Sequence, residues 1–106
     1  MPARTNPTLI ACGRFTIAGA ALTTQFARNC TFARTGAGEI NMTLGEAVDQ
    51  NESFMVVQSE TEDVVAFVAH TSDTVKVIRA RTTTAATTPT DGDFEVAIYR
   101  AAYGNK

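Results

Sequence analysis

The segments Thr74-Val-Lys-Val-Ile-Arg-Ala-Arg81 and Asp91-Gly-Asp-Phe-Glu-Val-Ala-Ile-Tyr-Arg100 decide the fold class. In each segment the residues alternate between two faces, which is the period of a β-strand. A Thr/Ala/Pro connector over 82–90 joins them and has no periodicity of its own. Two alternating segments around such a connector are typical of the last two strands of a small antiparallel sandwich.

The composition supports an all-β domain. The chain has 106 residues, which suffices for one domain, and 44% of them are apolar, which suffices for a core. Thr and Val are abundant, and their branched side chains fit a pleated sheet better than a helix. We therefore expect an antiparallel β-sandwich, of the jelly-roll type, with seven or eight strands.

Three further segments upstream have strand patterns. Leu9–Ile17 places Leu9 on the same face as Phe15, and Phe26–Ala33 reads as one continuous strand. The two glycines of 34–39 predict a tight hairpin, and the next strand directs Ile40, Met42 and Leu44 inward. The polar segment 45–52 is expected to be a loop, with one helical turn over 46–50 as an option.

Two segments are apolar on both strand faces. They are 53–58 (Ser-Phe-Met-Val-Val-Gln) and 64–69 (Val-Val-Ala-Phe-Val-Ala), joined by an acidic turn. Strands of this type are usually covered on both sides. Because a domain this small can cover only one side of a strand, we expect a second subunit to cover the other.

Charge and hydropathy exclude several classes of partner. The formal charge of −2 and the pI of about 5.2 disfavour nucleic-acid binding, which depends on neutralising phosphates. No apolar run approaches the roughly 20 residues that cross a bilayer. The first residues, Met1-Pro-Ala-Arg-Thr-Asn-Pro-Thr, lack the basic and apolar blocks of a secretory signal. We expect no nucleic-acid partner and no membrane, and either synthesis and retention in the cytoplasm or release inside an assembly or by lysis.

His70 is the one histidine, and Ser72 and Asp73 follow it closely. Catalytic triads assemble from distant segments on a rigid scaffold rather than from consecutive turn residues. We interpret His70 as a turn residue without a catalytic role, and we expect the protein not to be an enzyme.

No pattern predicts a cofactor or a metal. Asp91, Asp93 and Glu95 lie on one strand face, where carboxylates can bind a hard cation, but Asp-Gly-Asp is more typical of a turn. The acidic residues between 60 and 63 are expected to be a solvated loop tip. Cys12 and Cys30 match no zinc spacing; whether they form a disulfide or remain small buried side chains stays open.

Five arginines have two interpretations, as scattered ion pairs or as part of an interface: Arg28, Arg34, Arg79, Arg81 and Arg100. Arg79 is in phase with Val77, and Arg100 is in phase with Ile98. This phase suggests that both guanidinium groups face inward, where an unpaired charge would be costly.

The order of the segments resembles a known family. The quoted features are Phe32-Ala-Arg-Thr-Gly-Ala-Gly-Glu-Ile-Asn-Met-Thr-Leu44, then Glu52-Ser-Phe-Met-Val-Val, Ser72-Asp-Thr-Val-Lys-Val, and the closing Asp91-Gly-Asp-Phe-Glu-Val-Ala-Ile-Tyr. They are similar to the C1q/TNF-like jelly-roll domains of tailed-bacteriophage virions, which occur in tail fibre tips, head fibres and capsid decoration proteins. The resemblance covers most of 9–100 and implies a homotrimer.

Since no stalk precedes the domain, the chain looks more like a decoration protein than a fibre tip. The resemblance then implies a virion location on the capsid exterior, with the major capsid protein as partner. Residues 1–8 would form an arm that contacts the capsid through Arg4, Asn6 and Pro7, and 9–106 would be the single sandwich domain. The expected trimer interface contains Phe54, Val56, Val65, Phe67, Arg79 and Arg100.

The alternative is the receptor-binding tip of a tail or head fibre, which would recognise a host surface glycan or protein. Its site would lie on loops at one end of the sandwich, such as 45–52 and 82–90. These loops contain no aromatic residue, although sugar-binding sites usually present a flat ring, so the alternative is the weaker one.

Overall fold

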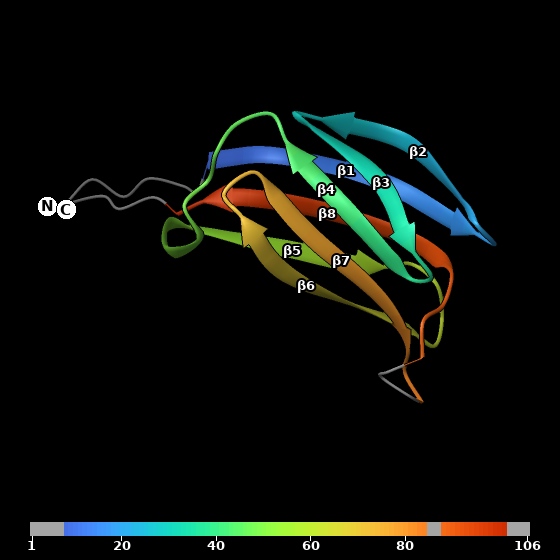
Figure 1. Cartoon of the computed structure of the whole chain (residues 1–106). Helices are drawn as coiled ribbons and strands as arrows, with labels where there is room; N and C mark the ends of the chain where they lie inside the picture. Colours follow the sequence, from blue (N-terminus) through green and yellow to red (C-terminus); the bar gives the residue numbers. More distant parts are fainter. Residues whose placement is uncertain (1–7, 85–87, 102–106) are drawn as a thin grey trace, which may run out of the picture.

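In the computed structural model, which describes residues 8–84 and 88–101, two four-stranded antiparallel sheets pack face to face (Figure 1). The expected all-β sandwich is confirmed, and the described residues contain no α-helix. The strands are β1 (Thr8–Ala18), β2 (Ala21–Arg28), β3 (Cys30–Gly36), β4 (Glu39–Leu44), β5 (Ser53–Ser59), β6 (Val64–Ser72), β7 (Val75–Thr82) and β8 (Gly92–Arg100).

The first sheet has the order β2-β1-β8-β5 and the second sheet has the order β3-β4-β7-β6. Hairpins join β1 to β2, β3 to β4 and β6 to β7 within a sheet, and the other connections cross between the sheets. Strands β1 and β8 pair along their length, from Thr8 opposite Arg100 to Ile17 opposite Gly92. One edge of the sandwich is therefore formed by β2 and β3, and the other by β5 and β6, which we call the β5–β6 edge.

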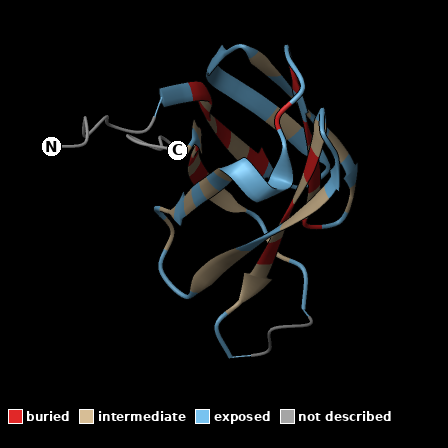
Figure 2. Ribbon diagram, turned by 90° about the vertical axis from the view of Figure 1, so that its left-hand side faces the viewer, coloured by how far each residue is buried: buried red, intermediate tan, exposed pale blue. Residues whose placement is uncertain are grey.

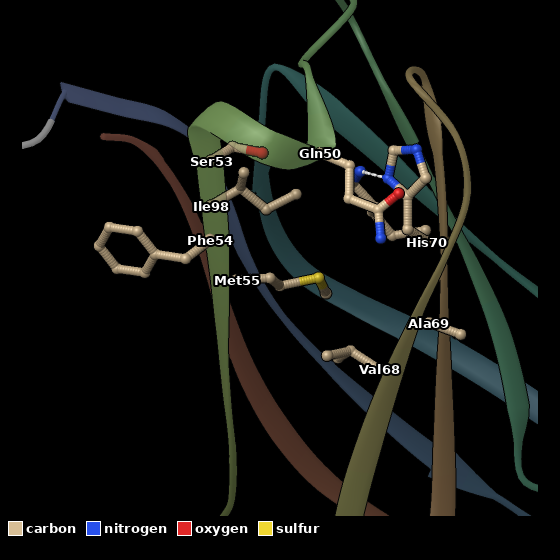
Figure 3. A pocket seen from close by; sticks show the side chains of 9 residues that line it. Gln50, Ser53, Phe54, Met55, Val68, Ala69, His70 and Ile98 are labelled. Carbon is tan, nitrogen blue, oxygen red and sulfur yellow. Dashed lines mark hydrogen bonds between the residues drawn. The ribbon is translucent and has the colours of Figure 1, made fainter. Parts of the chain in front are cut away.

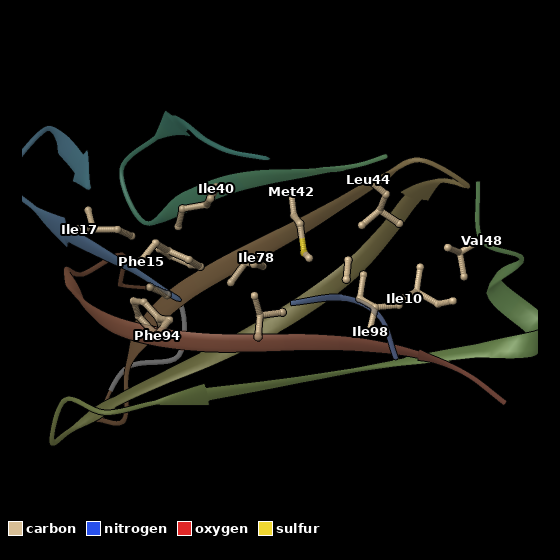
Figure 4. Packing of buried hydrophobic residues seen from close by; sticks show 13 residues of the cluster. Ile10, Phe15, Ile17, Ile40, Met42, Leu44, Val48, Ile78, Phe94 and Ile98 are labelled. Carbon is tan, nitrogen blue, oxygen red and sulfur yellow. The ribbon is translucent and has the colours of Figure 1, made fainter. Parts of the chain in front are cut away.

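The core lies between the central strands of the two sheets (Figure 4). Phe15 and Phe94 from the first sheet have ring centroids 5.5 Å apart and are fully buried. The expected inward alternation of β4 and β8 is confirmed, because these side chains are buried: Ile40, Met42, Leu44, Phe94, Val96 and Ile98. Each such side chain contributes roughly 1.5–3 kcal/mol when it leaves water.

The expected strand Phe26–Ala33 is wrong as one element, because Asn29 divides it. Asn29 adopts a left-handed conformation, with φ of 58°, and the chain passes there from β2 in the first sheet to β3 in the second. Its side-chain amide donates to the carbonyl oxygen of Ile10, at 3.0 Å, and to Glu46 Oε1, at 2.9 Å. The chain therefore crosses from one sheet to the other at Asn29, although the alternation of apolar and polar residues continues across this position.

The expected inward position of Leu9 is also wrong. The pairing of β1 with β8 shifts between Leu9 and Ala11, so one extra residue is inserted there. Such a bulge reverses the face of the residues before it. As a result Ile10 is buried, and Leu9 lies opposite Tyr99 on the outer face of the first sheet.

The segment 45–52 is a loop, as expected, but it contributes to the core. Val48 is buried, and its backbone N–H donates to the carbonyl oxygen of Asp73 at 2.8 Å. The helical turn lies later than 46–50: a short 3-10 helix spans Gln50–Glu52 and is capped by Asp49.

The tight hairpin between β3 and β4 is confirmed, and one glycine sets its shape. Gly38 has φ of +64°, whereas Gly36 lies outside the left-handed region. A Cβ atom at Gly38 would lie 2.7 Å from the carbonyl oxygen of Ala80, while a Cβ at Gly36 would meet nothing within 4 Å. The neighbouring strand β7 therefore approaches Gly38 too closely for any side chain.

We predict that Gly38→Ala lowers the free energy of unfolding by about 1–3 kcal/mol, because it combines backbone strain with a clash against β7. Urea unfolding at equal protein concentration measures the change. Gly36→Ala is the matched control in the same hairpin and should change stability by less than about 0.5 kcal/mol. Equal effects of the two substitutions would contradict this description of the hairpin.

Candidate functional site

Exposed apolar side chains gather at the β5–β6 edge. Large apolar side chains that are 41–50% exposed occur at six described positions, and four of them lie on β5 or β6: Phe54, Val56, Phe67 and Val68, with Leu9 and Phe26 elsewhere. Figure 2 shows pale, exposed segments alternating with buried ones along the strands. Clusters of this kind on a small domain usually mark an interaction site.

The outer face of the first sheet carries two adjacent apolar rows. The strand register places Leu9, Tyr99 and Phe54 side by side in one row, and the rings of Phe54 and Tyr99 stack with centroids 5.3 Å apart. The second row is formed by Cys12, Ala97 and Val56. We call these six residues the apolar rows. The row beyond them is polar, since Arg14 lies opposite Glu95 and Glu95 opposite Gln58.

The outer face of the second sheet carries Phe67 and Val65 beside arginines. Phe67 lies opposite Arg79, which in turn lies opposite Glu39, and the Arg79 Nε is 3.7 Å from Glu39 Oε1. Val65 lies opposite Arg81. The aliphatic stems of arginines can cover such apolar neighbours while the charge stays in water.

The expected trimer-interface residues therefore do not form one patch. Phe54 and Val56 lie on the outer face of the first sheet, while Val65, Phe67 and Arg79 lie on the outer face of the second. Four of these five residues lie on the β5–β6 edge, and Arg79 lies beside it on β7. Arg100 is at the end of β8 and binds Glu46 at 3.3 Å.

The expected inward orientation of Arg79 and Arg100 is wrong. Arg79 does share a face with Val77, but the buried face of β7 is the other one, which carries Lys76, Ile78 and Ala80. Arg100 ends its strand and is exposed. Alternation alone fixes which residues share a face, and it does not say which face is covered.

A hollow opens between the sheets at the β5–β6 edge (Figure 3). It encloses about 200 Å³ and is lined by Gln50, Ser53, Phe54, Met55, Val68, Ala69, His70, Lys76 and Ile98. Met55 from β5 and Val68 from β6 reach into it from opposite sides. Its volume is below the roughly 300–1,000 Å³ of drug-sized ligand sites, so it suits a small group.

Lys76 is the one buried charged side chain of the described residues, and it lies at the end of this hollow. Its ammonium group donates to His70 Nδ1. His70 Nε2 is in turn 3.4 Å from Asp73 Oδ1. Burial lowers the pKa of Lys76, and the negative charge of Asp73 opposes that effect in part.

His70 is not the turn residue that the sequence suggested. Strand β6 continues to Ser72, and the turn follows at 73–74. Ser72 directs its hydroxyl at Thr74, accepting from the Thr74 backbone N–H at 3.3 Å, rather than at His70. The structure thus brings His70 and Asp73 together but leaves Ser72 out, so no catalytic triad forms there.

The acidic residues are engaged in local contacts. Asp91 accepts from the backbone N–H of Gly19 at 2.8 Å, and Asp93, which lies within β8 rather than in a turn, accepts from Thr16 Oγ1 at 2.5 Å. Glu60 of the acidic turn binds Arg14 at 2.6 Å. Across 8–84 and 88–101, no three potential ligands lie close enough to hold a metal ion.

Both cysteines are free and half-buried in the structure. Cys30 Sγ lies 3.5 Å from the carbonyl oxygen of Cys12, and burial raises the pKa of the Cys30 thiol. A thiol of raised pKa is a weak nucleophile at neutral pH.

The five arginines are distributed over different surfaces. Arg34 is the one on an inward-facing position, opposite Ile40, and its buried Nε has no hydrogen-bond partner among the described residues. Arg81 donates to the carbonyl oxygens of Gly38 and Ala80. These arginines therefore lie at separate places on the sandwich and do not form one common surface.

The loops of the alternative glycan site are not neighbours. Segment 45–52 lies beside the 73–74 turn, through a bond from Val48 N to Asp73 O, at the end of the sandwich where β4 ends. The described part of 82–90 lies at the opposite end, where Thr83 N donates to Asp63 O (Figure 1). The expectation of one shared end is therefore wrong.

The expected capsid-contact residues Arg4, Asn6 and Pro7 lie outside the described residues. Thr8 is the first residue of β1 and not the last residue of the expected arm.

Comparisons with family models, curated proteins and solved structures found no match to this chain. Within the residues that the structure describes, no helix is long and apolar enough to span a membrane.

We predict that Lys76→Met raises the free energy of unfolding at neutral pH by about 1 kcal/mol, because an apolar side chain replaces a buried charge. Burial lowers the pKa of Lys76, so the unfolded chain holds this proton more tightly than the folded chain does. Stability therefore rises with pH between the two pKa values, and the variant should lose this rise.

Urea unfolding from neutral to alkaline pH, at one protein concentration, measures both effects. Arg28→Met is the control, since Arg28 is exposed on the opposite edge strand β2 and should leave the pH dependence unchanged. A variant that is several kcal/mol less stable than the parent would show that Lys76 is held by stronger contacts than its bond to His70.

Proposed function

We propose that this protein is a non-enzymatic structural protein that assembles as a homotrimer and decorates the exterior of a bacteriophage capsid. The scaffold in this proposal is a sandwich of the jelly-roll type. The observation that carries it is the concentration of exposed apolar side chains on both faces of the β5–β6 edge.

Self-association is favoured first by the strand edges. Strands β5 and β6 are the last strands of their sheets, so each has a row of backbone groups without a strand partner among residues 8–84 and 88–101. Proteins usually protect such edges with charges, prolines or bulges. Here β5 instead carries Phe54 and Val56 outward, and the pairing of β5 with β8 has no bulge.

A ring of copies is favoured by the position of the apolar groups. In a two-fold dimer the same patch meets itself, whereas in a ring each copy uses two different patches on two neighbours. The apolar rows and the pair Val65 and Phe67 are two such patches, on opposite sides of one edge. A ring of three copies agrees with the trimer that the family resemblance implies.

The capsid location and the major capsid protein as partner rest on the family resemblance. Three linked copies would bind a capsid lattice by avidity, since each later contact is intramolecular. Binding only the assembled shell stabilises it by mass action. The protein would be made in the host cytoplasm and act on the virion.

The absence of a catalytic role is supported by the contacts of the polar groups at the hollow. His70 is held between Lys76 and Asp73, and Ser72 is bonded to Thr74. A nucleophile and a general base must lie within hydrogen-bond reach of one another. Ser72 and His70 do not meet that requirement.

We predict that the purified protein sediments as a trimer at micromolar concentration and that Phe54→Asp dissociates it, because a carboxylate would be desolvated within the apolar contact. Thr31→Asp is the matched control, since Thr31 is exposed on the outer face of β3 at the other edge. Analytical ultracentrifugation gives the mass, and circular dichroism shows that each variant is folded. A monomeric parent protein would contradict the proposal.

We also predict that removal of residues 2–7, which leaves all of β1 intact, weakens binding to the capsid and preserves the trimer. The measurement is occupancy on capsids of the encoding phage after incubation with each protein. Unchanged occupancy would remove the arm from the proposal, and absence of binding by the intact protein would refute the capsid location.

A further inference from the structure

The hollow at the β5–β6 edge has apolar walls and a cationic end. Met55, Val68 and Ile98 provide the walls between the sheets, and Lys76 with His70 closes one end. This combination is unusual for a core, because an apolar space is normally filled and a buried charge is normally paired.

The space is open although it lies on the inner side of the sheet. Val68 is in phase with Ala66, which packs against the core, and both lie opposite the buried residues Ile78 and Ala80. Val68 nevertheless remains 41% exposed. Side chains around such a gap lack the van der Waals contacts that a filled core would provide. An apolar ligand in the hollow would supply those contacts.

Lys76 can accept a further partner. An ammonium group has three N–H donors, and the one hydrogen bond of Lys76 goes to His70. The other two donors have no hydrogen-bond partner among the described residues. Asp73 lies beyond His70, next to its Nε2 atom, and makes no hydrogen bond or salt bridge to the ammonium.

We propose that this hollow binds a small apolar carboxylate, with the carboxylate on Lys76 and the hydrocarbon between Met55 and Val68. A volume of about 200 Å³ corresponds to roughly seven water molecules at about 30 Å³ each, which suits a chain of about six carbons. Charge-assisted bonds from an ammonium to a carboxylate are stronger than neutral ones, so the charge selects acids over alcohols and amines. This site is independent of the capsid role.

Titration of the full-length protein with hexanoate, followed by amide chemical shifts in NMR, tests the proposal. We expect saturable shifts centred on Met55, Val68, Ala69 and His70, with a Kd on the order of 1 mM, because so small a ligand has few contacts. Hexan-1-ol and hexylammonium should bind at least about tenfold more weakly. Absence of saturable shifts, shifts confined to the apolar rows, or equal binding of hexan-1-ol would overturn it.

Two variants test separately the charge of Lys76 and the volume of the hollow. Lys76→Met should weaken hexanoate binding at least about tenfold, while Arg28→Met, which removes an exposed charge from the opposite edge, should leave the Kd unchanged. Val68→Phe keeps Lys76 but fills the hollow and should abolish binding. If hexanoate bound a folded Val68→Phe protein with the parent Kd, the hollow would not be the site.

The carboxylate could belong to a free acid or to the end of a peptide, and N-acetyl-norleucine distinguishes them because it adds a peptide group to the same hydrocarbon chain. Tighter binding of hexanoate assigns the site to a free acid, and tighter binding of N-acetyl-norleucine assigns it to a peptide terminus. Failure of both, in a protein that still sediments as a trimer, would overturn this inference alone.

Discussion

The structure depends on one constraint: a two-layer sandwich covers only one face of each strand. The central strand β8 respects this constraint near its start, where Phe94 is buried and Glu95 faces outward, whereas Ala97 and Tyr99 further along face outward in the apolar rows. In β5 both faces are apolar, with Met55 turned inward and Phe54 outward. The fold therefore leaves apolar area on the outer face of the first sheet, from β1 across β8 to β5, and around Phe67 on the second sheet.

The sequence predicts much of the fold because alternation follows from the geometry of a strand. It places Ile40 and Met42 inward correctly, and it identifies the hairpin that Gly38 closes. Prediction from this alternation fails where one residue interrupts the two-residue period of a strand. Asn29 turns the chain into the other sheet, and the bulge beside Leu9 reverses a face, but neither event changes the local pattern of apolar residues.

The candidate site shows a different limit. The sequence shows that Lys76 shares its strand face with Ile78. The opposite face, with Val75 and Val77, is equally apolar, so the alternation does not tell which face is buried. Which face is covered is settled by the partner sheet, which the sequence of one strand does not describe. The hollow could not be predicted from the sequence either, because it arises where β5 and β6, from different sheets, leave space between them.

The two proposed roles of the β5–β6 edge meet at strand β5, which turns the Phe54 ring outward into the apolar rows and directs Met55 into the hollow (Figure 3). A neighbour that packs on the apolar rows would contact the outer face of β5, whereas an occupant of the hollow would contact its inner face. The alternation of side chains along one strand therefore lets a single edge carry two independent binding surfaces. Lys76 belongs to the inner surface, where a buried ammonium with a single hydrogen bond among the described residues would be stabilised by a further partner.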